Sequence, residues 1–201
     1  QIKTPIASMH LILQKEDSED SRRLRAELFR VEQYVQMVLC FLRLDSDFTD
    51  YVIKEYRVDD IIRPAVRRLA PQFIMKKLAL EYEHTDEVAL TDEKWLGFVV
   101  EQVLSNAVKY TSEGSISIKC DGDRLVISDT GIGIAAEDLP RIFDKGYTGF
   151  NGRADRKASG IGLYLCRRIC DNLGHSIKAE SAPGHGTTII IGLERDKLEV
   201  E

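Results

Sequence analysis

The chain has 201 residues, 43% of them hydrophobic and 30% charged, and 28 Lys and Arg against 33 Asp and Glu give a net charge of −5. This length is typical of one or two domains, and a domain of about 150 residues buries a core without metals or disulfides. The mild acidity excludes a general attraction to nucleic acid, and no apolar run approaches the ~20 residues of a membrane span. We therefore expect a soluble segment that binds neither nucleic acid nor membrane directly.

The start of the chain and its cysteines narrow the class of protein. The chain opens at Gln1 without the basic leader and apolar stretch of a signal peptide, and a helical pattern is already under way there, so we expect a fragment of a longer protein. The four cysteines lack paired CxxC spacing, which favours reduced thiols in a cytosolic protein. Cys166 and Cys170 are four residues apart and would share a helix face, so a metal site there is the minor alternative.

Apolar residues in the first fifty positions recur at helical spacing in two runs, separated by the polar segment 15–21. The runs are Ile2, Ile6, Met9 and Leu13, then Leu24, Leu28, Val31, Val35, Val38 and Leu42. Alternating steps of three and four residues are typical of a helix that packs along a seam against another helix. Two antiparallel helices bury such seams poorly by themselves, so we expect two hairpins to form a dimeric four-helix bundle. The alternative is a hairpin that packs on its own domain.

After residue 50 the pattern alternates between short strands and helices. We expect strands over 51–58, 78–83, 115–120, 124–128, 177–180 and 187–193. We expect helices over 61–77, 91–110 and 159–173, with Thr91 as the N-cap of the second and Pro64 in the first turn of the first. The segment Asp121-Gly122-Asp123 predicts a tight turn between two strands. Because strands and helices do not alternate strictly, the sequence favours an α+β fold over a doubly wound parallel sheet.

Four polar residues share one face of the helix expected over 91–110. Gln102, Asn106, Lys109 and Tyr110 stand at positions i, i+4, i+7 and i+8. Amide oxygens suit Mg²⁺ and an ammonium group suits phosphate, so this face fits a metal-bound polyphosphate. A face turned to solvent is the alternative for these residues taken alone.

Three glycine pairs of the form GxG stand at boundaries between expected elements. They are Gly131 with Gly133, Gly160 with Gly162, and Gly184 with Gly186. Such glycines permit close approach of the backbone to a ligand, and a helix N-terminus that follows one attracts anions. None completes GxGxxG or GxxxxGK[ST], so the common dinucleotide and P-loop folds are disfavoured.

These segments together resemble a known family. Five of them, in chain order, are similar to the N, G1, F, G2 and G3 boxes of bacterial sensor histidine kinases of the GHKL ATP-binding superfamily: EQVLSNAVKYT, DTGIGI, RIFDKGYTG, SGIGLYL and GHGTT. The opening QIKTP resembles the end of their H box, HxxKTP, directly after the phosphoacceptor histidine. The segment FDKGYTGFNGR is similar to the corresponding segment of intramembrane-sensing kinases that respond to cell-envelope antibiotics.

The resemblance implies a fold and a domain organisation. Residues 1–48 would form a truncated helical hairpin for dimerisation and histidine phosphotransfer, which is half of a four-helix bundle. A linker near 46–50 would lead to a catalytic ATP-binding domain over 49–201, a two-layer α/β sandwich of the GHKL (Bergerat) type.

The resemblance also implies roles for individual residues toward ATP and Mg²⁺. Asp129 would accept a hydrogen bond from the adenine amino group, Gly131 and Gly133 would let the base approach, and Thr187 would contact the far side of the ring. Asn106 would ligate Mg²⁺ with Gln102 beside it, while Lys109 and Tyr110 would contact the phosphates.

The remaining implied residues belong to a mobile lid over the nucleotide. Phe143 would anchor a lid over 145–158, in which Arg153, Arg156 and Lys157 would meet phosphate charge or, alternatively, solvent. Gly160 and Gly162 would act as hinges, and Leu163 would begin the helix whose N-terminus faces the phosphates.

Two positions depart from the family pattern. Most GHKL ATPases carry Glu where this chain has Gln102, and Gln is no general base, which favours phosphotransfer over hydrolysis. Many histidine kinases carry an acidic residue at the position of Gln1, and an amide there does not supply the acid–base assistance of a carboxylate. Lys3 and Thr4 would lie at the transfer surface, with Thr4 where the family orients water for dephosphorylation of its partner.

The function implied is that of the cytoplasmic core of a membrane-bound sensor kinase. The intact homodimer would phosphorylate its own histidine and pass the phosphoryl group to an aspartate of a response regulator. The histidines present, His10 among them, lack the acceptor motif, so this chain is expected to bind ATP without phosphorylating itself. Alternatives are a conformational signalling module with mainly phosphatase or scaffold output, and a GHKL ATPase machine. The stimulus and the regulator are not encoded in any recognisable motif.

Overall fold

The structure is a computed structural model that describes residues 3–13, 15, 18–44, 51–149 and 159–194. The chain divides into two compact units, Gln1–Thr49 and Asp50–Glu201, which we call the hairpin unit and the sandwich unit. Among the described residues, no helix combines the length and the apolar character that crossing a membrane requires. The predicted linker residues 46–50 lie outside the described residues.

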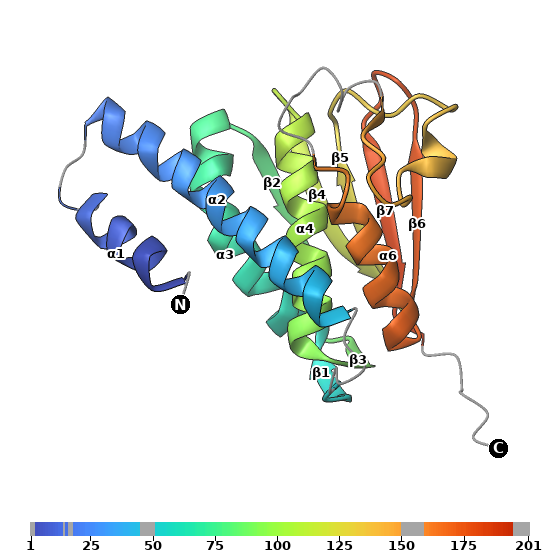
Figure 1. The fold of residues 1–201 in the computed structure, drawn as a ribbon. Coiled ribbons are helices and arrows are strands. Elements are labelled where there is room, and N and C mark those ends of the chain that lie inside the picture. The colour runs from blue at the N-terminus through green and yellow to red at the C-terminus, as the bar shows by residue number, and fades with distance from the viewer. Residues whose placement is uncertain (1–2, 14, 16–17, 45–50, 150–158, 195–201) are drawn as a thin grey trace. The chain divides into compact units, whose positions relative to one another are not determined.

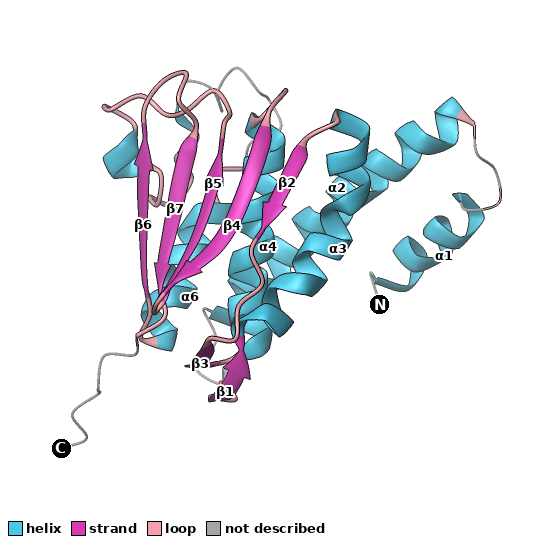
Figure 2. Ribbon diagram, turned by 180° about the vertical axis from the view of Figure 1, so that it is seen from behind, coloured by secondary structure: helices cyan, strands magenta, loops and turns pink. Residues whose placement is uncertain are grey.

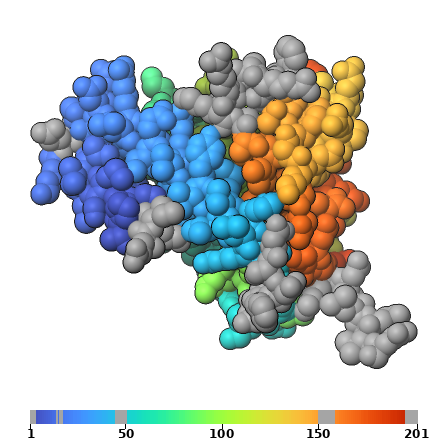
Figure 3. Space-filling model, viewed as in Figure 1, coloured from blue at the N-terminus to red at the C-terminus, as the bar shows by residue number. Residues whose placement is uncertain are grey.

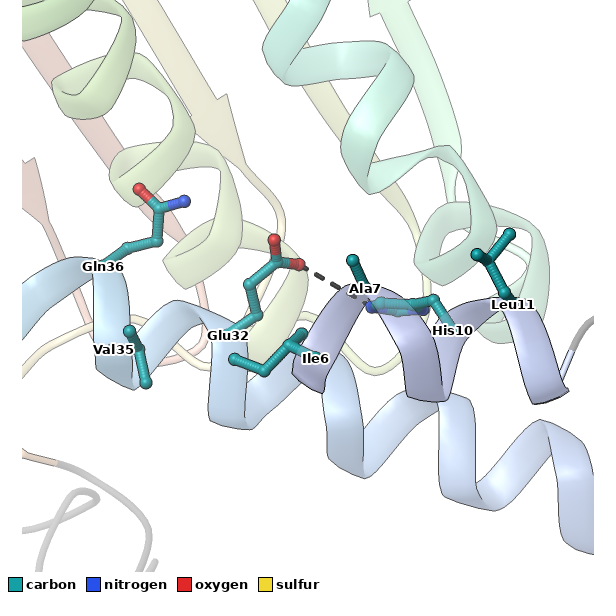
Figure 4. A pocket seen from close by; sticks show the side chains of 7 residues that line it. All are labelled: Ile6, Ala7, His10, Leu11, Glu32, Val35 and Gln36. Carbon is teal, nitrogen blue, oxygen red and sulfur yellow. Dashed lines mark ion pairs between the residues drawn. The ribbon is translucent and has the colours of Figure 1, made fainter. Parts of the chain in front are cut away.

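The hairpin unit consists of two helices, α1 (Lys3–Leu13) and α2 (Glu19–Leu44), as the two apolar runs predict. Ser18 caps α2 because its Oγ accepts a hydrogen bond from the backbone N–H of Ser21 at 3.1 Å. Figure 4 shows a groove between the helices in which His10 of α1 lies toward Glu32 of α2, with 3.8 Å between Nε2 and Oε2. The residues that line this groove are Ile6, Ala7, His10, Leu11, Glu32, Val35 and Gln36.

The predicted seam of α2 is largely uncovered within this unit. Leu28 is buried, but four other seam residues have exposed fractions between 49% and 60%: Leu24, Val31, Val38 and Leu42. Apolar side chains spaced along one helix in this way indicate a surface that needs a partner.

The sandwich unit is built on a five-stranded mixed sheet in the order β2-β4-β5-β7-β6. The strands are β2 (Ala79–Tyr82), β4 (Ser115–Asp121), β5 (Arg124–Asp129), β6 (Ser176–Ser181) and β7 (Thr187–Gly192). The β2–β4 pair is parallel and the other pairs are antiparallel. Alternate residues of these strands face the core, as Ile116 and Ile118 do on β4, both with no exposed surface.

Three helices cover one face of this sheet (Figure 1), and they are α3 (Val58–Lys76), α4 (Glu93–Tyr110) and α6 (Gly162–Leu173). Figure 2 shows the opposite face of the sheet open. Their apolar stripes supply the other half of the core, including the fully buried Leu69, Leu104 and Leu165. A two-stranded ribbon of β1 (Lys54–Arg57) and β3 (Val88–Thr91) and a short helix, η1 (Leu139–Arg141), complete the unit. The predicted α+β fold with two layers is confirmed.

The predicted cap of α4 is wrong by one residue. Thr91 ends β3, a strand that the sequence did not reveal, and its buried Oγ is hydrogen-bonded to Nε2 of His175 at 2.9 Å. Asp92 is the N-cap instead, since its Oδ1 accepts from the backbone N–H groups of Lys94 and Trp95 at 2.9 and 3.1 Å. The other carboxylate oxygen of Asp92 accepts from the backbone N–H of Val52 at 2.8 Å, which fastens the start of this unit to α4.

Two other boundaries differ from the expected ones. The strand expected over 51–58 is shorter because Val58 already begins α3, so Pro64 lies in the second turn of that helix rather than in its first. The helix expected from 159 begins at Gly162, after the glycine pair.

A buried polar cluster joins α3 to β2. Asp59 is 2% exposed, and its carboxylate accepts a hydrogen bond from the hydroxyl of Tyr82, lies 2.6 Å from Nη2 of Arg63 and lies 3.2 Å from Nδ1 of His84. Burial opposes ionisation of Asp59, but the contacts with Tyr82, His84 and Arg63 outweigh it and lower the pKa of the carboxyl group.

Three of the four cysteines are buried free thiols: Cys40 in the hairpin unit, and Cys166 and Cys170 on α6. Burial raises the pKa of Cys40 and of Cys170 to about 12. Cys40 and Cys170 therefore remain protonated at neutral pH, and all three buried thiols pack as small apolar side chains.

Candidate functional site

The structure places the predicted polar face on the second half of α4. Gln102 and Asn106 are half-buried, Lys109 is exposed, and the ammonium nitrogen of Lys109 lies 4.9 Å from the centroid of the Tyr110 ring. Tyr110 is the last residue of α4, and the other three precede it on the same helix.

Lys76, at the end of α3, holds this C-terminus in place. Its ammonium group donates to the backbone carbonyl oxygens of Val108, Lys109 and Thr111 at 2.6, 3.1 and 2.9 Å. The last carbonyls of a helix lack partners within the helix and carry partial negative charge, so an ammonium group is well suited to them. Sequence analysis did not find Lys76, since contacts across more than 30 residues leave no local signal.

The first glycine segment joins the end of β5 to the end of α4. Asp129 is the last residue of β5, and its Oδ1 accepts from the backbone N–H of Gly131 at 2.8 Å. The backbone N–H of Ile132 donates to the carbonyl oxygen of Tyr110 at 3.2 Å. A side chain at Gly131 would collide with that same carbonyl oxygen, so only glycine permits this approach. Asp129 and Tyr110 are therefore brought together although 19 residues separate them.

The third glycine segment interlocks with the first. The backbone N–H of Gly184 donates to the carbonyl oxygen of Ile132 at 2.8 Å. Gly133 has φ +69°, and a Cβ there would collide with the carbonyl group of Ala182. Thr187 pairs directly with Asp129 across β7 and β5, so it begins its strand beside the carboxylate.

Ser181 fixes this junction, and sequence analysis missed it. Its Oγ accepts from the backbone N–H of Ile134 at 2.9 Å, donates to the carbonyl oxygen of Gly186 at 2.6 Å and lies 3.0 Å from Oγ of Thr187. A serine at the end of a strand carries no pattern that predicts such contacts.

The second glycine segment brings the N-terminus of α6 against α4. A Cβ on Gly162 would collide with the side-chain amide of Gln102, so the two helices touch at this glycine. The carbonyl oxygen of Gly160 accepts from the backbone N–H of Gly146 at 2.9 Å, which joins the segment after η1 to the start of α6. In Figure 3 these segments, yellow and orange, lie side by side.

The predicted lid is described only at its edges. Phe143 and Leu163 are half-buried on either side of it, in the segment after η1 and in the first turn of α6. Arg153, Arg156 and Lys157 lie outside the described residues, as does most of the range 145–158. Lys3 and Thr4 belong to the first turn of α1 in the hairpin unit, where Oγ of Ser8 donates to the carbonyl oxygen of Thr4 at 3.1 Å.

The carboxyl group of Asp129 is the strongest electrostatic feature of the site. Burial raises its pKa, although the backbone N–H groups of Gly131 and Thr187 and the hydroxyl group of Thr111 act in the opposite direction. Burying a carboxylate that faces no cation in these contacts opposes folding of the chain. Such a group is typical of a ligand-binding site.

These donors and acceptors are suited to a phosphorylated purine with a divalent cation. A buried carboxylate accepts from an amino group, a helix N-terminus with Lys109 attracts phosphates, and amide oxygens ligate Mg²⁺. The described residues contain no group of three or more His, Cys, Asp or Glu side chains able to cage a metal. The donor set therefore fits a cation that shares its coordination between the Asn106 amide and phosphate oxygens.

Comparison with known proteins agrees with this chemistry. Residues 91–197 match the family model described as histidine kinase-, DNA gyrase B- and HSP90-like ATPase. The chain belongs to this ATPase family.

Two curated relatives are named as sensor histidine kinases. Sensor histidine kinase YxdK of Bacillus subtilis is 34% identical over 94% of this chain, and sensor histidine kinase GraS of Staphylococcus epidermidis is 36% identical over 93%. The chain spans 60% and 56% of the length of these two proteins.

Two solved structures share the fold. Acinetobacter baumannii histidine kinase AdeS aligns over 98% of both chains with a TM-score of 0.65 at 18% identity. Full-length ShkA, solved in complex with AMPPNP, aligns over 98% of this chain and 45% of its own, with a TM-score of 0.66 at 20% identity.

Proposed function

We propose that this chain is the cytoplasmic catalytic core of a sensor histidine kinase, which binds ATP with Mg²⁺ and supplies the γ-phosphoryl group to a histidine of the intact protein. The observation that carries the proposal is the packing of the glycine segments around the second half of α4: the first meets the end of α4 beside Asp129, the third interlocks with the first, and the second brings the N-terminus of α6 against Gln102. Membership of the ATPase family and the AMPPNP complex of ShkA support nucleotide binding.

The base would bind at the Asp129 side of this site. The carboxylate accepts from the adenine amino group, Gly131 and Gly133 leave room for the ring, and Thr187 contacts its far side. A guanine base presents a carbonyl oxygen where adenine presents an amino group, so the carboxylate disfavours it.

The phosphates would bind between α4 and the start of α6. Lys109 and Tyr110 contact them from one side, and Gly160, Gly162 and Leu163 present the helix N-terminus from the other, with Phe143 packed beside the lid. Asn106, with Gln102 beside it, would hold Mg²⁺, which neutralises phosphate charge when bound.

Among the described residues, neither Gln102 nor its neighbour Glu101 is placed to act as the base that activates water. Gln102 cannot accept a proton from water, and the neighbouring Glu101 is engaged by Arg68 of α3, with 3.1 Å between Oε2 and Nη1. This supports transfer of the phosphoryl group to a side chain rather than multiple-turnover hydrolysis.

Phosphotransfer would use the hairpin unit. Its uncovered seam fits a second copy of the chain, which would complete a four-helix bundle and bury Leu24, Val31, Val38 and Leu42. Lys3 and Thr4 would flank the acceptor histidine, and a response regulator would dock against α1 and receive the phosphoryl group on an aspartate. We place the intact protein at the cell membrane with this core on the cytoplasmic side, as the sensor names of the relatives suggest.

Nucleotide binding is tested by calorimetry with ATP in Mg²⁺ and in EDTA. Asn106→Ala should lose about tenfold or more of the Mg²⁺-dependent affinity and change little in EDTA, because only the metal contact is removed. Asn172→Ala, at the exposed end of α6, is the matched control and should bind as the unsubstituted chain does. Unchanged affinity of Asn106→Ala in Mg²⁺ would contradict the metal assignment.

Phosphotransfer is tested by extending the chain with a helix that ends in histidine directly before Gln1. With γ-labelled ATP, we expect protein-bound label that is acid-labile and base-stable and that disappears when the added histidine is changed to glutamine. Nucleotide binding without label would instead favour a conformational module with phosphatase or scaffold output. Steady release of ADP by the 201-residue chain would favour an ATPase machine.

A further inference from the structure

Thr111 is a buried residue with an unusual hydroxyl group. It follows α4 directly and has no exposed surface, and among the described residues its Oγ has no hydrogen-bond partner. Its backbone is fully engaged, since its N–H donates to the carbonyl oxygen of Ala107 at 3.1 Å and its carbonyl oxygen accepts from Lys76. Native proteins rarely bury a hydroxyl without a partner, and such a group is worth explaining by function.

The hydroxyl group lies beside the Asp129 carboxylate. A Cβ built on Gly131 would lie 2.9 Å from Oγ of Thr111 and 2.8 Å from Oδ1 of Asp129, so both oxygens line the same side of this glycine. Although it makes no hydrogen bond of ordinary geometry, the hydroxyl is close enough to the Asp129 carboxyl group to lower its pKa, against the effect of burial. Thr111 is therefore a donor within reach of the group that the proposed function assigns to the base.

We propose that Thr111 is a positioning residue for base selection: when a purine nucleotide binds, its hydroxyl donates to the Asp129 carboxylate and holds that carboxylate as an acceptor for a 6-amino group. This inference rests on the proposed function. Without the hydroxyl, the carboxylate keeps only its backbone donors and takes up a proton more readily. A protonated carboxyl group donates to a 6-oxo group, so discrimination between 6-amino and 6-oxo purines falls.

The test compares ADP with inosine 5′-diphosphate, in Mg²⁺, on the 201-residue chain by calorimetry. Thr111→Val keeps the shape and removes the hydroxyl, and it should lower ADP affinity by about tenfold while changing inosine diphosphate affinity much less. Thr111→Ser should restore the ratio of the two affinities. An unchanged ratio in Thr111→Val, or an equal loss for both nucleotides, would overturn the inference.

Two controls separate this role from structural damage and from failure of the proposed function. Thr188→Val removes a hydroxyl from the neighbouring sheet, where Thr188 Oγ is 2.9 Å from Oγ of Ser128, and should leave the ratio unchanged. If thermal unfolding shows that Thr111→Val does not fold, Thr111→Ala against Thr111→Ser provides the same comparison. Failure of the unsubstituted chain to bind ADP would overturn the proposed function itself, whereas normal ADP binding with an unaltered ratio overturns only the role of Thr111.

Discussion

Asp129 is held in a state that favours binding over stability. Its raised pKa means that the folded chain holds a proton on this carboxyl group more tightly than the unfolded chain does. The stabilisation associated with that proton is present below the ordinary pKa of about 4 and is lost as the pH rises through the higher folded value. At neutral pH the ionised, half-buried carboxylate therefore opposes folding.

Asp129→Asn should stabilise the sandwich unit and weaken nucleotide binding. The amide oxygen can still accept from the backbone N–H of Gly131, and the buried charge is gone, so we expect Tm at pH 7 to rise by about 2 °C. Affinity for ADP should fall by about tenfold or more because an amide is a weaker acceptor than a carboxylate. Thermal unfolding and calorimetry check the two effects, and a lowered Tm would contradict the argument.

The residues of the site differ in how far sequence predicts them. Asn106, Asp129 and the glycine pairs stand in short segments with a recognisable order, so they were found together. Lys76, Ser181 and Thr111 act through contacts with backbone carbonyls or with residues distant in the chain, and their types are common on any surface. Nothing local distinguishes Lys76 and Ser181, so only the folded structure reveals them. Thr111 ends the recognised segment EQVLSNAVKYT, but no pattern there predicts that its hydroxyl group is buried beside Asp129.

At the scale of the element, α4 is defined by how its two ends are held. Asp92 caps the first turn and Lys76 satisfies the carbonyls of the last one. The predicted site residues all lie in its second half, so the support from Lys76 is nearer to them than that from Asp92. The geometry of Lys109 and Tyr110 therefore depends on a side chain of α3.

Lys76→Met should loosen the last turn of α4. The methionine keeps much of the side-chain length but leaves three carbonyl oxygens without their donor, so we expect a loss of about 2 kcal/mol in the free energy of unfolding. Affinity for ADP should fall more than affinity for adenosine, since Lys109 meets the phosphates in the proposed site. Urea unfolding and calorimetry measure both, with the exposed Lys119→Met as control. Equal effects of the two substitutions would refute the role of Lys76.

The elements themselves were largely predictable, with instructive exceptions. Apolar periodicity predicted α1 and α2, and the expected helices and strands after residue 50 correspond to α3, α4, α6 and the five strands of the main sheet. The strand β3 was missed because it pairs with β1, which lies far from it in the sequence, and no local signal encodes that pairing. The N-cap was misassigned because Thr91 and Asp92 are both good caps, and pairing in β3 decides between them.

At the scale of the whole molecule, two carboxylates give opposite responses to acid. The lowered pKa of Asp59 means that its contribution to stability is present above the ordinary value of about 4 and is lost as the pH falls through the lower folded value. Asp129 responds in the reverse direction, as argued above. As the pH falls, the sandwich unit therefore loses stability at Asp59 and gains stability at Asp129, and its net response to acid is the sum of these two opposite effects.

Asp59→Asn should destabilise the sandwich unit at pH 7 and flatten its response below about pH 4. Loss of charge-assisted contacts with Tyr82, Arg63 and His84 should cost about 2 kcal/mol in the free energy of unfolding. Asp60→Asn, an exposed neighbour in the same turn of α3, is the matched control and should change little. Thermal unfolding at pH 7 and pH 3 distinguishes them, and a constant difference between Asp59→Asn and the unsubstituted chain at both pH values would contradict the linkage.

Each unit contains at least one buried thiol whose chemical labelling can report local opening of that unit. Cys40 belongs to the hairpin unit, whereas Cys166 and Cys170 lie on α6 at the core of the sandwich unit. A buried thiol reacts with a maleimide chiefly when the structure around it opens, so the rate of labelling reports how often it opens. Mass spectrometry of the labelled peptides separates Cys40 from the pair on α6. One unmodified chain can thus report, in a single reaction mixture, how often each unit opens. It also shows whether a nucleotide slows the labelling of Cys166 and Cys170 while leaving the labelling rate of Cys40 unchanged.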